Sequence, residues 1–394
     1  MSAEPGIVPG HARDPMSESL GCWIATIPRA PDLSDPYREV IHEPGVIDPS
    51  LDEQASLWAT FLSSVPPESP VLGLIDQHLG RCRQIVLPKV APWDHPGQSD
   101  WTRWAWQANA IWWTGQDRFL DPAGELLLDR HGTIAPTAQV PFPVDARQRM
   151  LRSEVELRNR SVEPVNGVPP VSGLEEANLR TPELIAQRAL ALFLVAVRAE
   201  AILGDHPLSV EQMRARSPLG YQALSPRERE FFDSKNPDPV MAEVFIWRYE
   251  ALATFQWALG IRADQKWPDE RMDQADIVSP MLRLADERFV SKTQTRPTQA
   301  LLDALDQTLR LWWVADNAHQ EAAQQTSASP EGLPGGIEAI IIAERLAALA
   351  WMCHWPPSFL ADREAVSAPA TTGPKSPHTD WDRCIDTFVH ALFA

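Results

Sequence analysis

Two nearly uncharged segments of the chain each carry an acid and a base that could form a charged site. The first segment carries Arg248 and Glu250, and the second carries Glu344 and Arg345. Both segments have helical hydrophobic periods, so two residues that are two positions apart point to different faces and cannot satisfy each other. Because an unpaired buried charge is costly, we expect the four residues to pair across the two helices.

These four charges allow two interpretations. The first is a buried ionic network that fixes the register of the two helices, since such networks perturb pKa values without doing chemistry. The second is a functional pocket built on the same side chains. We favour the network.

Tryptophan is a second source of binding chemistry, because the chain has 16 of these residues and each supplies a large contact area and one hydrogen-bond donor. Core packing is the alternative, and it is the more economical explanation for most of them. Neighbours on a helix point about 100° apart, so an adjacent tryptophan pair cannot easily face one core. The candidate interface aromatics are Trp112, Trp113, Trp312 and Trp313.

Motifs for catalysis are missing from the sequence. It contains no G-x-G-x-x-G, no Walker loop, no H-E-x-x-H and no G-x-S-x-G. The best histidine and acid grouping runs from His378 to Asp382, and a helix cap explains Asp380 better than a metal does. We therefore predict no catalytic residue, no metal site and no cofactor.

Composition excludes several classes of partner. The chain has 394 residues, with 53 Asp and Glu against 35 Lys and Arg, and the net charge of −18 repels nucleic acid and anionic lipid headgroups. The most apolar stretch, 184–203, is interrupted by Gln187, Arg188 and Arg198, so it predicts no membrane span. Four cysteines without a C-x-x-C pair and an N-terminus without an apolar run favour a cytoplasmic protein.

The elements that must position these residues fall into three predicted parts. Residues 1–20 are expected to be disordered, 21–146 to form an N-terminal α/β domain, and 147–394 to form a helical domain. The fold class is α+β, in which a small N-terminal α/β part with antiparallel hairpins precedes a mainly α-helical C-terminal domain. The chain is longer than the size at which one hydrophobic core stops growing, and this length also favours two domains.

In the N-terminal part, the pattern predicts a short helix over 52–62, a strand over 84–90 and a hairpin over 118–128. Asp121-Pro122-Ala123-Gly124 has the residue types of a tight turn. From Trp101 to Trp113 the alternation favours a half-buried strand with Trp104 and Trp106 facing one core, although a helix fits part of it.

In the C-terminal part, local sequence signals mark where helices begin. Thr181-Pro182-Glu183 and Ser225-Pro226-Arg227-Glu228 both have the order of a cap, a proline and an early acid. Segment 240–259 carries few charges, so we expect one central helix there. Its largely buried residues should be Trp247, Leu252, Phe255 and Leu259. The other long helices are expected over 298–318, 337–355 and 380–392.

Several short pieces of the C-terminal part follow one another in a recognisable order. They are Arg180-Thr181-Pro182-Glu183, Phe245-Ile246-Trp247-Arg248-Tyr249-Glu250-Ala251-Leu252, Trp257-Ala258-Leu259-Gly260, Leu301-Leu302-Asp303, Arg310-Leu311-Trp312-Trp313, Glu344-Arg345, Ala348-Leu349-Ala350-Trp351, and Trp381-Asp382 followed by Asp386-Thr387. Together they resemble the DUF4272 family, a bacterial family of unknown function, over about residues 147–390. Where the family often has Glu-Arg-His, this chain has Glu344-Arg345-Leu346, so a catalytic histidine at that position would be lacking here. The resemblance implies a mainly helical domain and no established activity.

The sequence thus supports two hypotheses of function. The first is a non-catalytic cytoplasmic protein-interaction module that neutralises or regulates a basic protein partner, such as a toxin domain, as an immunity protein does. Acidity, tryptophan content and the lack of catalytic motifs motivate it. The alternative is a small-molecule enzyme or ligand-binding protein with a charged site between the helices or at the domain junction. A cleft that reaches the four charges would favour the alternative.

Overall fold

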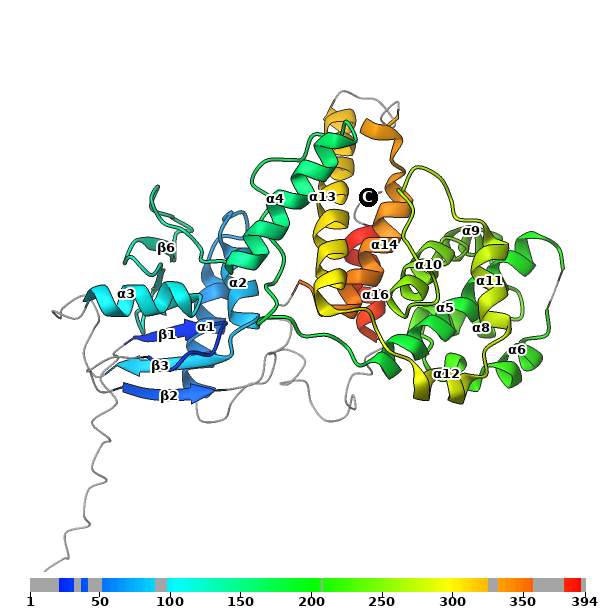
Figure 1. Cartoon of the computed structure of the whole chain (residues 1–394), viewed down its shortest axis with the longest axis horizontal. Coiled ribbons are helices and arrows are strands. Elements are labelled where there is room, and N and C mark those ends of the chain that lie inside the picture. The colour runs from blue at the N-terminus through cyan, green and yellow to red at the C-terminus, as the bar shows by residue number, and fades with distance from the viewer. Residues whose placement is uncertain are drawn as a thin grey trace, which may run out of the picture. The chain divides into compact units, whose positions relative to one another are not determined.

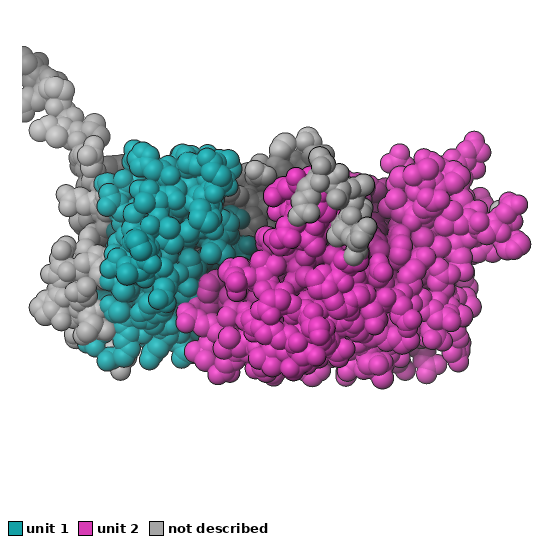
Figure 2. All heavy atoms as spheres, turned by 90° about the horizontal axis from the view of Figure 1, so that it is seen from above, with its two compact units in different colours: residues 1–141, 357–367 teal, residues 142–356, 368–394 magenta. Residues whose placement is uncertain are grey.

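The computed structural model describes residues 21–31, 37–41, 52–88, 98–206, 208–324, 332–356 and 379–390. Contacts between Cα atoms divide the chain into two compact units, 1–141 with 357–367 and 142–356 with 368–394 (Figure 2). The boundary expected from the sequence follows residue 146, and the expected disorder of residues 1–20 lies outside the described residues.

The first unit is built on a six-stranded sheet in the order β2-β3-β1-β4-β5-β6, in which every neighbouring pair is antiparallel. Helices α1 and α2 cover one face of the sheet and α3 covers the other (Figure 1). The elements are β1 (Cys22–Ala25), β2 (Tyr37–Ile41), α1 (Asp52–Ser64), α2 (Leu72–Gly80), β3 (Gln84–Pro88), α3 (Gln98–Gln107), β4 (Ala110–Trp113), β5 (Arg118–Leu120) and β6 (Leu126–Asp129).

The predicted hairpin over 118–128 is confirmed. Strands β5 and β6 pair antiparallel, and the Asp121 carboxylate accepts hydrogen bonds from the backbone N–H groups of Ala123 and Glu125 at 2.8 and 2.9 Å. Gly124 has φ 92°, a conformation that residues with a Cβ rarely adopt. The expected helix over 52–62 is confirmed as α1. The strand expected over 84–90 is confirmed for 84–88, as β3, and residues 89–90 lie outside the described residues.

The expectation of a strand from Trp101 onward is wrong for its first half. This stretch is helix α3 up to Gln107, and only β4 is a strand. Trp104 is buried, but Trp106 is 36% exposed, so the two do not face one core. In a helix, Trp101, Trp104 and Ala105 share one face, which can be buried as a unit. This helical spacing outweighs the alternating pattern that favoured a strand.

Two of the four candidate interface aromatics are core residues instead. Trp112 and Trp113 are adjacent in β4 and point to opposite faces of the sheet. Trp112 packs against Trp23 with the α3 side chains, and Trp113 packs against Phe61 of α1 and Phe119 of β5. Both are buried, so neither can contribute to a surface.

The second unit is mainly helical, and the α+β class is confirmed. Its helices α5, α13 and α14 pack with α10 around the largest hydrophobic cluster. Its elements are α4 (Val144–Asn159), α5 (Pro182–Leu203), α6 (Val210–Arg216), α7 (Pro218–Gln222), α8 (Pro226–Asp233), α9 (Pro239–Phe245), α10 (Arg248–Ala258), α11 (Gln274–Leu282), α12 (Asp286–Lys292), α13 (Thr298–Gln324), α14 (Ala339–Met352), α16 (Thr379–Ile385) and a π-helical turn (Asp386–His390).

Two helix starts read from the sequence are confirmed by their caps. Thr181 Oγ1 accepts a hydrogen bond from the Leu184 N–H at the start of α5, and Gly204 follows its last residue. Ser225 and Glu228 form a reciprocal capping box at α8. No helix among the described residues is long and apolar enough to cross a membrane.

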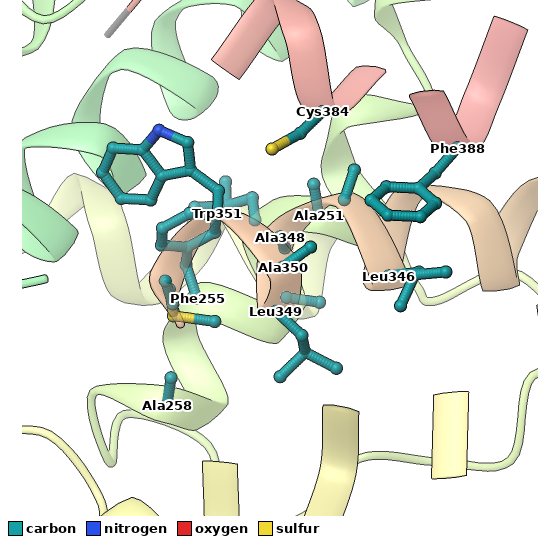
Figure 3. Packing of buried hydrophobic residues seen from close by; sticks show 14 of the residues in the cluster. Ala251, Phe255, Ala258, Leu346, Ala348, Leu349, Ala350, Trp351, Cys384 and Phe388 are labelled. Carbon is teal, nitrogen blue, oxygen red and sulfur yellow. The ribbon is translucent and has the colours of Figure 1, made fainter. Parts of the chain in front are cut away.

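The single central helix expected over 240–259 is instead two helices. The chain turns at Ile246 and Trp247, so that α9 and α10 are separate elements. Leu252, Phe255 and Leu259 are buried in α10, as predicted, and Phe255 packs beside Trp351 of α14 (Figure 3). Trp247 lies in the turn between the two helices and is only half-buried. Helix α9 before it has one face in water, where Val240 is 64% exposed.

A buried histidine makes the stability of the first unit depend on pH. The His78 Nε2 atom lies 3.0 Å from the Ile24 carbonyl oxygen, and burial lowers the pKa of His78 to about 3. Below the ordinary histidine pKa the unfolded chain therefore binds a proton that the folded chain does not. The free energy of unfolding falls as the pH is lowered from about 6.5 toward 3.

We predict that His78→Gln loses less stability than the parent when the pH falls from 7 to 5, by about 2 kcal/mol. Denaturant unfolding of the full chain at both pH values measures this difference. His131→Gln, at an exposed histidine of the same unit, is the control. Equal pH dependence in the His78 variant and the parent would contradict the prediction.

Candidate functional site

The first half of the four-residue charge cluster is a fully satisfied ion pair. The Glu250 Oε2 atom of α10 accepts hydrogen bonds from Nη2 and Nε of Arg345 of α14, at 3.0 and 3.3 Å. Its Oε1 atom accepts one from the Met272 N–H at 2.7 Å, and Arg345 Nη1 donates to the Lys266 carbonyl oxygen at 2.6 Å. Both side chains are buried. Through these hydrogen bonds the pair joins α10, α14 and the loop between α10 and α11.

The second half is incomplete. Arg248 Nη1 of α10 donates a hydrogen bond to Glu344 Oε1 of α14, and both side chains are buried. Glu344 Oε2 has no hydrogen-bond partner among the described residues, and the same holds for Arg248 Nε. The structure thus pairs the four residues across the helices, as expected, but leaves one carboxylate oxygen without a donor.

The surroundings of Glu344 favour its protonated form. Burial raises the pKa of Glu344 to about 7, against the opposing effect of Arg248, and the negative charges of Glu250 and Glu228 raise it further. A carboxyl group of this kind changes charge near neutral pH. An additional positive charge beside it would favour the ionised form.

Glu344 forms part of the wall of a cavity of about 830 Å³. One wall comes from α9 and the turn after it, and another from the start of α14 and the residues before it. The described lining residues are Val240, Glu243, Val244, Trp247, His319, Gly332, Leu333, Ile337, Glu338, Ala339, Ile340, Glu344, Val389 and His390.

The cavity is mostly apolar with a negative electrostatic bias. Its acids are Glu243, Glu338 and Glu344, and no Lys or Arg is among the described lining residues. The two histidines already have contacts, because His319 Nδ1 lies 2.8 Å from the Ala315 carbonyl oxygen and His390 Nδ1 lies 2.9 Å from Asp386. Such a cavity can bind an organic cation by charge and apolar contact together.

Nucleophilic chemistry has little support here. No Ser, Thr, Cys, Tyr or Lys is among the described lining residues. Burial raises the pKa of all four cysteine thiols, so none of them is poised as a thiolate. The described residues also contain no group of three or more His, Cys, Asp or Glu that could hold a metal.

Asp380, expected as a helix cap, lies inside α16 instead. Its carboxylate accepts a hydrogen bond from Arg180 Nη2 at 2.8 Å. His378, its neighbour in the sequence, lies outside the described residues. This grouping therefore joins α16 to the start of α5.

The tryptophan pair on α13 divides as its helical spacing requires. Trp312 is buried, and its Nε1–H donates to the Phe388 carbonyl oxygen at 2.9 Å. Trp313 is 37% exposed. Of the four candidate interface aromatics, only Trp313 reaches the surface.

The sequence did not indicate the other cavity residues. Val240, Val244 and Trp247 follow each other at helical spacing, and this pattern predicts part of a buried helix. His319, Glu338 and His390 come from three other stretches, and nothing in their local sequence connects them. Their proximity depends on how α9, α13, α14 and the π-helical turn pack.

Comparisons with known proteins give one match. The family model described as a domain of unknown function (DUF4272) matches residues 149–360, which include all four charges of the cluster. No curated protein and no solved structure shows a significant match to the chain.

We predict that Glu250→Ala destabilises the protein by roughly 3–5 kcal/mol, because it leaves Arg345 buried without its counter-charge. Thermal and denaturant unfolding of the full chain measure the loss. Glu270→Ala, the same substitution at an exposed loop position, is the matched control. An unchanged melting temperature for Glu250→Ala would refute the structural role of this pair.

Proposed function

Because the chain belongs to the DUF4272 family, whose function is unknown, we propose its function from the site alone: the helical unit is a non-catalytic binding protein for an organic cation, held at Glu344. The carrying observation is that Glu344, whose buried Oε2 atom has no donor among the described residues, is one of the residues that line the cavity. A buried acceptor without a partner costs about 1–3 kcal/mol, and a ligand N–H would recover that cost.

Charge supports a cation rather than a neutral donor. Among the residues that the structure describes, Glu344 has a single cationic partner, Arg248, while Glu243 and Glu338 add two more carboxylates to the lining. Neither of these two forms an ion pair with another described residue. A positive ligand is attracted by all three acids, and the chain's net charge of −18 draws it in from a distance.

Cavity size and shape favour a small ligand. A volume of about 830 Å³ is in the range of pockets that enclose small molecules. The apolar side chains that line it suit a hydrocarbon body, which would then carry its charge toward Glu344. The lack of a nucleophile among the described lining residues supports binding rather than group transfer.

A basic protein partner, such as a toxin domain, is the second candidate. The net charge favours fast capture of a basic surface, and a lysine side chain would bring the same chemistry to Glu344 as a small amine. A cytoplasmic location fits both candidates, since all four cysteines are free and buried. Most described tryptophans lie in the cores, which leaves this candidate with less support than the cavity gives the first.

We predict that Glu344→Gln weakens the binding of cadaverine and agmatine at least tenfold, because it removes the charge that holds the cationic head. Isothermal titration calorimetry on the full chain measures binding, and a melting curve checks that the variant is folded. Glu230→Gln, an exposed glutamate outside the cavity, is the matched control. A short lysine-rich peptide tests the second candidate, a basic protein partner. We measure whether this peptide competes with cadaverine for the site.

Absence of binding by both amines, or equal binding by the Glu344 variant, would refute the proposed site. Binding of the lysine-rich peptide alone would favour the basic partner.

We also predict that the parent binds cadaverine about tenfold more tightly at pH 8 than at pH 6. Glu344, with a pKa near 7, is ionised at pH 8 and mostly protonated at pH 6, and the cation binds the ionised form. Isothermal titration calorimetry at both pH values measures the ratio.

Other titratable groups surround Glu344, so a control is required. The charged neighbours are Arg248, Glu250, Arg345 and Glu228 with its partner Arg188, and the cavity adds Glu243, Glu338, His319 and His390. The Glu344→Gln variant should lose the pH dependence. If its residual binding keeps the same tenfold ratio, another group is responsible.

A further inference from the structure

We infer that the ligand class of this cavity is a linear aliphatic diamine or longer polyamine, with one ammonium at Glu344 Oε2 and a second near Glu243 and Glu338. This inference rests on the proposed function and specifies its ligand. Three features of the site carry it. They are the one oxygen of Glu344 that has no donor among the described residues, the apolar side chains around it, and two acids that form no ion pair with another described residue.

The available oxygen selects the cationic head. A guanidinium binds a carboxylate best through two parallel hydrogen bonds, which need both oxygens. At Glu344 one oxygen already accepts from Arg248, so only Oε2 remains. An ammonium is a compact point charge that needs no paired acceptor, and it is therefore the better head for this position.

Apolar side chains favour a hydrocarbon stem without polar substituents. Val244 on α9 and Ile340 on α14 both line the cavity, and Ile340 precedes Glu344 by one helical turn. Neither residue offers a hydrogen bond to a hydroxyl or a carboxylate on the stem. A chain of methylene groups meets these residues at no desolvation cost.

Two further carboxylates select a second positive charge. Glu338 immediately precedes α14, six residues before Glu344, which corresponds to about 9 Å of helix rise. Glu243 lies on α9, and both glutamates are exposed and line the cavity. A second ammonium on the same stem would meet these acids directly, whereas a monoamine held at Glu344 meets them only by long-range attraction.

The test compares matched ligands by isothermal titration calorimetry on the full chain. Pentylamine and pentylguanidine differ only in the head, and we expect pentylamine to bind about tenfold more tightly. Cadaverine adds a second ammonium to pentylamine, and we expect a gain of about five- to tenfold, above the twofold that two equivalent ends give statistically.

The double variant Glu243→Gln/Glu338→Gln should reduce the advantage of cadaverine over pentylamine to about twofold, while pentylamine loses only the long-range attraction of the two acids. A guanidine that binds as tightly as the amine, or a cadaverine advantage that survives in the double variant, overturns the inference. In either case, if binding still depends on Glu344, the proposed function stands. Absence of binding by all three ligands overturns both.

Discussion

The ion pair between Glu250 and Arg345 is the contact on which the centre of the helical unit depends. Each charge needs the other, because several kcal/mol would be lost if either remained buried alone. The same two side chains hold the backbone at Met272 and Lys266, so α10, α14 and the loop after α10 meet at one point. Once this pair sets the register of the two helices, Arg248 must lie opposite Glu344.

Buried arginines perform a similar task elsewhere in the helical unit. Arg180 donates to the Trp351 carbonyl oxygen near the end of α14, and Arg188 donates to the Ala223 carbonyl oxygen and pairs with Glu228. A guanidinium has several donors in a fixed plane, so it can satisfy a helix end and an acid together. The arginines thereby give side-chain donors to the buried carbonyl groups of Trp351 and Ala223, at helix ends where the last carbonyl groups lack the regular helical hydrogen bond.

Sequence patterns predicted those structural features that depend mainly on residues close together in the chain. The cap at Thr181 and the turn at Asp121 need only their neighbours, and the charge pairing followed from the cost of burial. The break between α9 and α10 was missed, because no glycine or proline marks Ile246 and Trp247. The cavity was missed too, since its walls come from distant stretches and an orphaned carboxylate oxygen has no sequence signal.

The structure also explains what the leucine after Glu344-Arg345 means for this site. Leu346 is buried in the hydrophobic cluster, where Figure 3 shows it near Phe388 and the neighbouring α14 side chains. Two positions along a helix turn a side chain by about 200°, so Leu346 points away from the side on which Glu344 meets the cavity. A histidine at this position would enter an apolar core, where burial favours its neutral form. The leucine therefore removes no charged group from the Glu344 cavity, and the binding chemistry proposed there is independent of it.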